Sequence, residues 1–204
     1  MRLVAVSAGL STPSSTRLLA DRLVESVRDE LAVRGGVVSA EVVELRELAG
    51  DIADHLVTGF PAPHLAAAIG AVTGADGLIA VTPVFTASYS GLFKSFFDVI
   101  DPDALADKPV LVAATGGTAR HSLVLEHAMR PLFAYLRTAV VPTAVYAASA
   151  DWGSGGDAYA DGLPARIRRA GGELATLMAD RPTRVEPADD VTALEQHLAD
   201  LRFD

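Results

Sequence analysis

The sequence predicts an α/β protein built on a doubly wound parallel sheet. Strand-like apolar runs alternate with helical patterns along the chain, beginning with an apolar run at residues 3–7 and an amphipathic pattern at 14–33. Five runs lack polar alternation, which is typical of parallel strands covered by helices on both faces. A chain of 204 residues, 50% of them hydrophobic, has enough apolar side chains for one well-packed core.

The elements follow in chain order from these patterns. The strands are expected at residues 3–7, 39–45, 77–82, 110–115 and 139–146. The helices are expected at residues 14–33, 64–72, from about 89, at 121–137 and at 163–178. Gly35 and Gly36 end the first helix, and Pro131 should kink the fourth helix or begin a new one, because proline lacks an amide hydrogen. Residues 46–60 have mixed polarity and are expected to form a surface excursion.

Five parallel strands joined by helices match a flavodoxin-like sheet, in which ligands bind beyond the carboxyl ends of the strands. Residues 1–180 are expected to form this domain. Residues 181–204 are expected to form a C-terminal tail with a short helix at 191–201. The glycine-rich segment 147–156, which follows the last strand, is expected to be mobile.

The composition disfavours several classes of partner. With 17 basic and 26 acidic residues the net charge is -9, which argues against binding nucleic acid or anionic membranes. The chain has no cysteine, which excludes disulfides, thiolate catalysis and iron–sulfur clusters. Its five histidines lack metal-ligand spacing, so no metal site is expected. We see no signal peptide and no apolar run near 18 residues, and therefore expect a soluble cytoplasmic protein.

A hydroxyl-rich turn leads from the first strand directly into a helix. Helix N-termini offer unpaired amide donors and the positive end of a dipole, so hydroxyl groups beside them suit a phosphate monoester. The candidate residues of this turn are Ser7, Gly9, Ser11, Ser14, Ser15 and Thr16. The turn has no lysine, and Arg17 is expected to be the only local cation. Capping of the helix by Ser14 or Ser15 is the alternative explanation.

A second turn carries a specific resemblance. The segment TPVFTASYSGLFKSFFD, residues 82–98, resembles one found in the NAD(P)H-dependent FMN reductases. The residues that keep the family's spacing are Pro83, Phe85, Ser88, Gly91 and Lys94. The similarity extends over about residues 1–155 and is greatest to the FMN reductases that partner luciferase-like flavin-dependent monooxygenases.

The resemblance implies a task for each of three turns. The first turn takes the FMN phosphate, the second runs along the isoalloxazine ring, and Thr115–Gly–Gly–Thr118 meets the pyrimidine end of that ring. The further candidates for FMN binding are Pro83, Val84, Phe85, Ser88, Tyr89, Ser90, Thr115, Gly116, Gly117 and Thr118. Val84 and Phe85 offer apolar surface to a flat ring, and glycine amides can donate to flavin O2 and N1.

Structural explanations of the same residues stay open. The hydroxyl groups of the second turn can cap the next helix, Lys94 can pair with Asp98 four residues later, and a glycine pair can mark an ordinary turn. Asp151 and Trp152 are expected either to line the ring pocket of a second subunit or to pack a loop. Many family members carry a Gly-Ser-x-Arg pattern in the first turn, which this chain lacks. The choice between NADPH and NADH is therefore open.

The function that the resemblance implies is an NAD(P)H:FMN oxidoreductase. Hydride passes directly from NADPH or NADH to FMN, so we expect no catalytic acid or base. Reduced FMN is expected to pass to a partner monooxygenase, and the enzyme to be a homodimer or homotetramer. The alternatives are a quinone or azo-compound reductase that retains FMN and a non-catalytic flavodoxin-type electron carrier.

Overall fold

The structure, a computed structural model, describes residues 1–153 and 162–181. The strands are β1 (Arg2–Ser7), β2 (Ser39–Glu44), β3 (Gly77–Phe85), β4 (Ser88–Tyr89), β5 (Pro109–Gly116), β6 (Ala139–Val140) and β7 (Val145–Ala148). The α-helices are α1 (Ser15–Val33), α2 (Ala49–Thr58), α3 (Pro63–Gly74), α4 (Gly91–Asp98), α5 (Arg130–Tyr135) and α6 (Leu163–Ala179). The predicted short helix at 191–201 and residues 154–156 of the glycine-rich segment lie outside the described residues.

The strands form one sheet in the order β2-β1-β3-β5, with β6 and β7 both paired to the outer side of β5. These pairings are parallel, and only the two-residue strand β4 runs antiparallel, against the end of β3. The prediction of an α/β sheet of five parallel strands is confirmed, although two segments occupy the fifth position. In the segment between β6 and β7, side chains take the place of some strand-to-strand hydrogen bonds. Arg130 donates to the Val141 carbonyl at 3.0 Å, and Glu173 accepts from the Thr143 amide at 2.7 Å.

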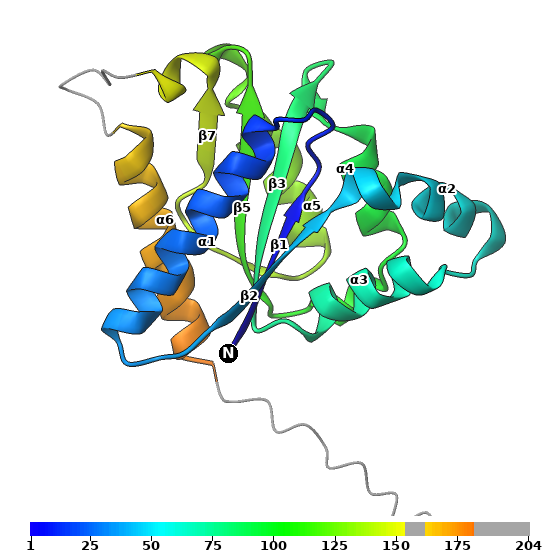
Figure 1. The fold of residues 1–204 in the computed structure, drawn as a ribbon, viewed down its shortest axis with the longest axis horizontal. Helices are drawn as coiled ribbons and strands as arrows, with labels where there is room; N and C mark the ends of the chain where they lie inside the picture. The colour runs from blue at the N-terminus through cyan, green and yellow to red at the C-terminus, as the bar shows by residue number, and fades with distance from the viewer. Residues whose placement is uncertain (154–161, 182–204) are drawn as a thin grey trace, which may run out of the picture.

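Helices cover the sheet on both faces, as predicted (Figure 1). Alternate strand residues point to opposite faces: Leu3 and Ala5 pack with α1 and α6, whereas Val4 and Val6 pack in the core that includes α2, α3, α4 and α5. The edge strand β2 is the exception. Its first three residues are exposed, so the prediction that every strand is buried on both faces is wrong for this edge.

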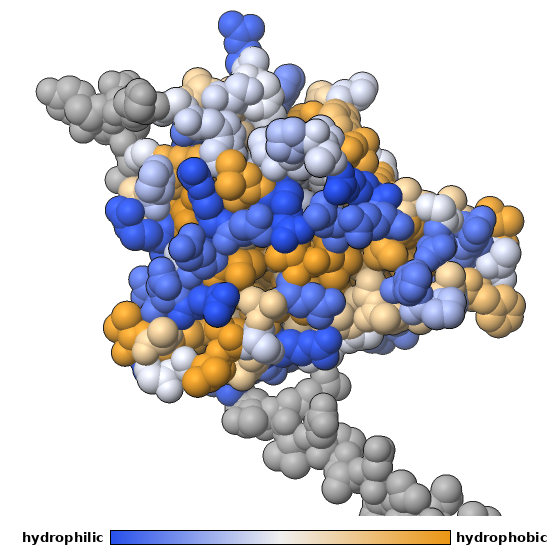
Figure 2. Space-filling model, in the orientation of Figure 1, coloured by the Kyte–Doolittle hydropathy of each residue, from blue (hydrophilic) through white to orange (hydrophobic). Residues whose placement is uncertain are grey.

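The segment predicted as a surface excursion is helical. A 3₁₀ helix at Leu45–Leu48 runs into α2, which buries Ile52 (1% exposed) and ends at Gly59 with φ 78°. Most of the other α2 side chains are exposed, which explains the mixed polarity of the sequence. Figure 2 shows hydrophobic residues at the end of the molecule formed by α2 and the α2–α3 connection, where Val57 and Phe60 are exposed.

Two further features concern the helices. Pro131 lies in the first turn of α5, directly after a π-helical turn at Leu125–Met129. The helical backbone continues from that turn without a break, so the irregularity predicted at Pro131 is a change from π-helical to α-helical hydrogen bonding. Within the described part of the chain, no single helix is long and apolar enough to cross a membrane. The bent pair Leu45–Thr58 and Pro63–Gly74 meets the length and composition criteria only when its two members are taken together.

Candidate functional site

The carboxyl ends of the parallel strands enclose a cavity of about 400 Å³. It is lined by Leu10, Ser11, Ser15, Thr16, Pro83, Val84, Phe85, Thr115, Gly116, Gly117, Ser149 and Trp152. All three predicted turns contribute to it, because parallel strands end at the same edge of the sheet. The segment after β7 adds a fourth side through Ser149, which was not predicted, and Trp152, which was expected at the ring pocket of a second subunit or in the packing of a loop.

The first turn brings hydroxyl groups to the cavity at the start of α1. Ser11 and Ser15 are exposed and line the cavity, whereas Thr16 is only 2% exposed. The Thr16 hydroxyl lies 2.8 Å from the Thr115 hydroxyl, which joins the first and third turns. Ser14 caps α1 and accepts a hydrogen bond from the Arg17 amide at 3.2 Å, so the capping alternative describes Ser14.

Ser7 and Gly9 lie beneath this turn and do not line the cavity. The Ser7 hydroxyl oxygen is buried and has no hydrogen-bond partner among the described residues. A Cβ on Gly9 would overlap the Ser14 hydroxyl, so glycine lets the chain pass close to the helix cap. Gly9 therefore shapes the turn from within, whereas Ser7 is a buried residue at the end of β1.

The second turn presents the end of β3 to the cavity. Strands β3 and β4 form a hairpin, with Thr86 and Ala87 in the left-handed conformation at φ 48° and 66°. This leaves the Phe85 side chain 46% exposed at the cavity wall. Its flat apolar side chain is thus available to a planar ligand.

The predicted hydroxyl residues of the second turn lie in the second strand of the hairpin and directly after it, outside the cavity lining. Ser88 pairs with Phe85 in the hairpin, and the Tyr89 ring lies 5.8 Å from the Phe93 ring. Ser90 caps α4, accepting from the Phe93 amide at 3.1 Å, and its own amide donates to Thr82 Oγ1 at 3.0 Å. Capping describes Ser90 as well.

In the third turn the two glycines have different surroundings. A Cβ on Gly116 would overlap the Tyr146 hydroxyl, which donates to the Thr118 carbonyl at 2.8 Å. Burial, and then the charge of Asp151, raise the pKa of Tyr146, so its hydroxyl stays a neutral donor. A Cβ on Gly117 would meet nothing within 4 Å. Thr118 caps the short helix Ala119–His121 rather than lining the cavity.

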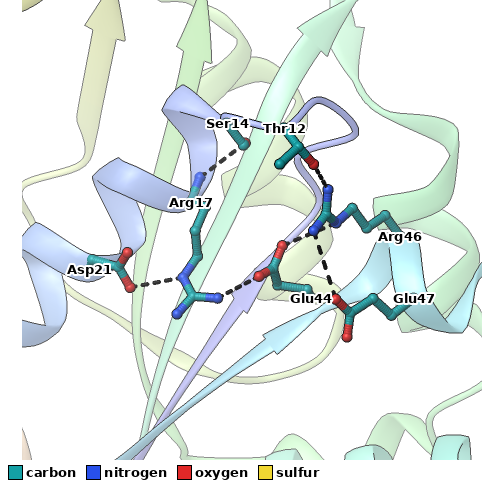
Figure 3. Close-up of polar contacts among 7 residues, drawn as sticks. All are labelled: Thr12, Ser14, Arg17, Asp21, Glu44, Arg46 and Glu47. Atoms are coloured by element: carbon teal, nitrogen blue, oxygen red, sulfur yellow. Dashed lines mark hydrogen bonds and ion pairs between the residues drawn. The ribbon is translucent and has the colours of Figure 1, made fainter.

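A second cation lies beside the first turn, so the prediction that Arg17 is the only local one is wrong. Arg46 donates to the Thr12 hydroxyl, and its Nε lies 3.2 Å from Glu44 Oε2 (Figure 3). The parallel pairing of β1 with β2 sets Ser7 opposite Glu44, which carries Arg46 to the turn from 34 residues away. Adjacent positions of the first two predicted strands were the signal that could have found it.

Arg17 turns toward carboxylates. Its Nε lies 2.8 Å from Asp21 Oδ1, and its Nη1 lies 2.5 Å from Glu44 Oε1. The hydrogen bond to Asp21, together with Glu44, raises the pKa of Arg17. Both arginines near the turn are therefore already paired with acidic side chains.

The segment after β7 closes the cavity with residues of the same chain. Trp152 lines the cavity and packs against the core beneath α1 and α6, and the Arg22 guanidinium lies 5.0 Å from its ring centroid. Asp151 accepts from the Ala148 amide at 2.7 Å and from Arg166 at 3.0 Å, which holds this segment to α6. Trp152, expected either at the ring pocket of a second subunit or in loop packing, lines the cavity of its own chain. Leu10 and Ser149 could be anticipated only from their places at the strand ends.

Two other expectations concern charged side chains. Lys94 and Asp98 form the i,i+4 ion pair given above as the alternative. Among residues 1–153 and 162–181, no three histidine, aspartate or glutamate side chains gather in a way that would hold a metal ion.

Comparison with known proteins agrees with this geometry. Residues 1–153 match the family model of the NADPH-dependent FMN reductases. The chain belongs to this family. The prediction of an NAD(P)H:FMN oxidoreductase, with FMN and a nicotinamide nucleotide as substrates, is thereby confirmed.

Individual relatives cover most of the chain. It is 39% identical over 183 residues to an FMN reductase (NADPH) of Pseudomonas aeruginosa, covering 88% of this chain and 94% of that protein. It is 37% identical over 177 residues to the NADH-dependent FMN reductase SfnF of Pseudomonas fluorescens, covering 87% and 91%.

Solved structures support the same fold. The X-ray structure of an oxidoreductase from Corynebacterium diphtheriae is 48% identical, with a TM-score of 0.84, covering 89% of this chain and 98% of that one. An archaeal flavodoxin, 12% identical with a TM-score of 0.57 and covering 88% and 99%, shares the fold. The flavodoxin-like fold is therefore confirmed.

Proposed function

We propose that this enzyme binds FMN in the cavity at the carboxyl ends of β1, β3 and β5 and reduces it with NADPH or NADH. One observation carries the proposal: a single cavity of about 400 Å³ joins the hydroxyl-rich start of α1 to an exposed apolar wall at the end of β3. An anion fits the first end and a planar ring the second. FMN, once bound, accepts a hydride from the nicotinamide ring.

The chain's own residues then have binding and positioning tasks. Ser11, Ser15 and Thr16, with the first amides of α1, hold the phosphate. Val84 and Phe85 support the ring from the second turn, and Trp152 adds apolar surface from the segment after β7. The other predicted residues shape these turns from behind. They are Ser7, Gly9, Ser14, Ser88, Tyr89, Ser90 and Thr118.

The third turn is proposed to face the pyrimidine end of the ring. Gly117 is exposed and lines the cavity, and its amide is proposed to donate to an oxygen that gains negative charge on reduction. The Gly116 backbone runs beside it, and Thr115 ties the turn to α1 through Thr16. These residues orient the flavin, and the reaction needs no acid or base from the protein.

We propose that FMN exchanges with solution and that reduced FMN passes to a flavin-dependent monooxygenase. Ser11, Ser15, Phe85 and Gly117 are all exposed, so a flavin in this cavity has an open route out. Binding through neutral donors also favours exchange. Retention of FMN for quinone or azo-compound reduction is the competing function, and a carrier without turnover is the third.

The assembly and location of the enzyme are further proposals. We expect a homodimer or homotetramer, because Leu123 and Tyr135 expose apolar surface that a second subunit can cover. We also expect the enzyme to act in the cytoplasm. Residues 1–180 are proposed to form the catalytic domain and 181–204 an added tail. Light scattering on the purified protein measures the number of subunits.

The experiment that tests the function measures NADH and NADPH oxidation by the purified protein with and without added FMN. We expect oxidation that depends on added FMN and a protein that loses its flavin on gel filtration. If neither nucleotide is consumed at saturating FMN, the reductase function is wrong for this chain. Turnover with FMN that stays bound favours the quinone or azo-compound reductase, and bound FMN without turnover favours the carrier.

A further inference from the structure

Glu44, at the end of β2, lies between the two arginines beside the first turn (Figure 3). One of its carboxylate oxygens is 2.5 Å from Arg17 Nη1, and the other is 3.2 Å from Arg46 Nε. The Glu44 side chain is 18% exposed, which makes it the most enclosed charged group of this cluster. It therefore holds both guanidinium groups at once.

The cluster as a whole carries no positive charge for a ligand. Arg17 also pairs with Asp21, and Arg46 lies 3.7 Å from Glu47 and donates to the Thr12 hydroxyl. Its two arginines and three carboxylates leave a net charge of −1. Thr12 is the neighbour of Ser11, which lines the cavity, so this net negative charge lies beside the proposed phosphate position.

A phosphate monoester carries between one and two negative charges near neutral pH. Unpaired arginines beside it would strengthen its binding, whereas arginines already paired with carboxylates add little. Hydroxyl groups and helix amides are then left to hold the phosphate.

We infer that Glu44 is an affinity-determining residue: by pairing with Arg17 and Arg46, it weakens phosphate binding at the first turn and keeps FMN exchangeable. This inference rests on the proposed function, because it takes the phosphate to be that of FMN. It assigns to Glu44 an effect opposite to that of an ordinary binding residue. Removing its charge should improve binding.

The test is Glu44→Gln, which keeps the shape of the side chain and removes its charge. The dissociation constants of FMN and riboflavin are measured by quenching of flavin fluorescence, without any turnover. We expect FMN to bind on the order of fivefold more tightly than to the wild type and riboflavin to bind unchanged. The gain for FMN should shrink as salt is raised, because screening weakens exposed charge interactions.

Glu47→Gln is the matched control. It removes the same charge from the same cluster, but its side chain is 68% exposed and lies 3.7 Å from Arg46, so the FMN constant should change less than twofold. Asp21→Asn is the second test, because this exposed side chain on α1 can be replaced without disturbing the end of β2. It should tighten FMN binding by an amount between those of the other two variants.

Several outcomes overturn the inference. Glu44→Gln binding FMN with wild-type or weaker affinity does so, as does an equal gain for riboflavin. The Michaelis constants for NADPH and NADH are compared on the same variants, and a change confined to NADPH would place the cluster at the 2′-phosphate of the nucleotide instead. A wild-type protein that binds no flavin contradicts the proposed function rather than the role of Glu44.

Discussion

The turns after β1 and β3 are both rich in hydroxyl residues but use their hydroxyl groups differently. Each contains several hydroxyl residues, and each ends in a serine that caps a helix, Ser14 for α1 and Ser90 for α4. In the first turn, hydroxyl groups on both sides of the cap reach the cavity. In the second, only the strand end reaches it. In both turns the capping serine bonds to its helix and does not line the cavity.

The β3–β4 hairpin explains this difference. After β1 the chain makes one more sheet-like bond, from the Ala8 amide to the Val81 carbonyl at 3.0 Å, and then leaves the sheet directly toward α1. After Thr82, β3 continues to Phe85 and turns back through β4. The hairpin places its own first strand at the cavity and hides the residues that follow. The path that the chain takes after the strand therefore decides which hydroxyl groups can meet a ligand.

The third turn gives the largest test of this difference. One of its two glycines is restricted by the fold, as the cap serines are, and the other has no close neighbours. Gly116→Ala is expected to lower the free energy of unfolding by about 2–3 kcal/mol, since its Cβ overlaps the buried Tyr146 hydroxyl and the bond to the Thr118 carbonyl is lost. Gly117→Ala, the matched control, should change it by less than about 0.5 kcal/mol. Urea unfolding measures both, and equal values would show that Tyr146 does not restrict this turn.

Serine-to-alanine variants in the first two turns distinguish a role in folding from a role in FMN binding. Ser90→Ala is expected to lower the free energy of unfolding by about 1–2 kcal/mol, because α4 loses its cap, while the FMN dissociation constant stays within about twofold. Ser15→Ala should leave the unfolding free energy within about 0.5 kcal/mol and raise the FMN constant about tenfold, because one bond to a charged group is lost.

Urea unfolding and flavin fluorescence quenching give the two values for each serine variant. Ser14→Ala is the control that shares the chemistry of Ser15 and the capping role of Ser90. It should resemble Ser90→Ala in stability. The comparison between the turns fails if Ser90→Ala weakens FMN binding as much as Ser15→Ala does.

Local patterns predicted the parts of this fold and site that depend on local forces. Apolar runs located the parallel strands, although β3 continues three residues past its predicted end and the fifth run divides into β6 and β7. Pro131 marked the start of α5, and the serine before α1 is its cap. The hairpin was missed because β4 has two residues and the turn before it uses Thr86 and Ala87 instead of glycine or asparagine. In α2, one deeply buried residue is too weak a pattern to indicate a helix.

Contacts between distant segments were beyond those patterns. Arg46 reaches Thr12 only through the register of β2 against β1, and no local preference of either segment encodes that meeting. Gly116 was expected to admit a ligand, whereas the structure shows that it also makes room for Tyr146, which comes from β7. Such roles depend on which strands are neighbours, a property of the whole sheet.

Tyr146→Phe is the smallest test and concerns the same use of a hydroxyl group by the fold. At pH 7 it should lower the free energy of unfolding by about 1 kcal/mol, because the Thr118 carbonyl loses its donor. Burial and Asp151 raise the pKa of Tyr146 above 10.0, so the folded protein favours the neutral hydroxyl more than the unfolded chain does. Its contribution is present in full below the unfolded pKa and is lost as the pH rises through the folded pKa. Urea unfolding of both proteins from about pH 7 to 11 should show the wild-type advantage shrinking above pH 10, and an advantage that stays constant would mean that the fold does not hold Tyr146 neutral.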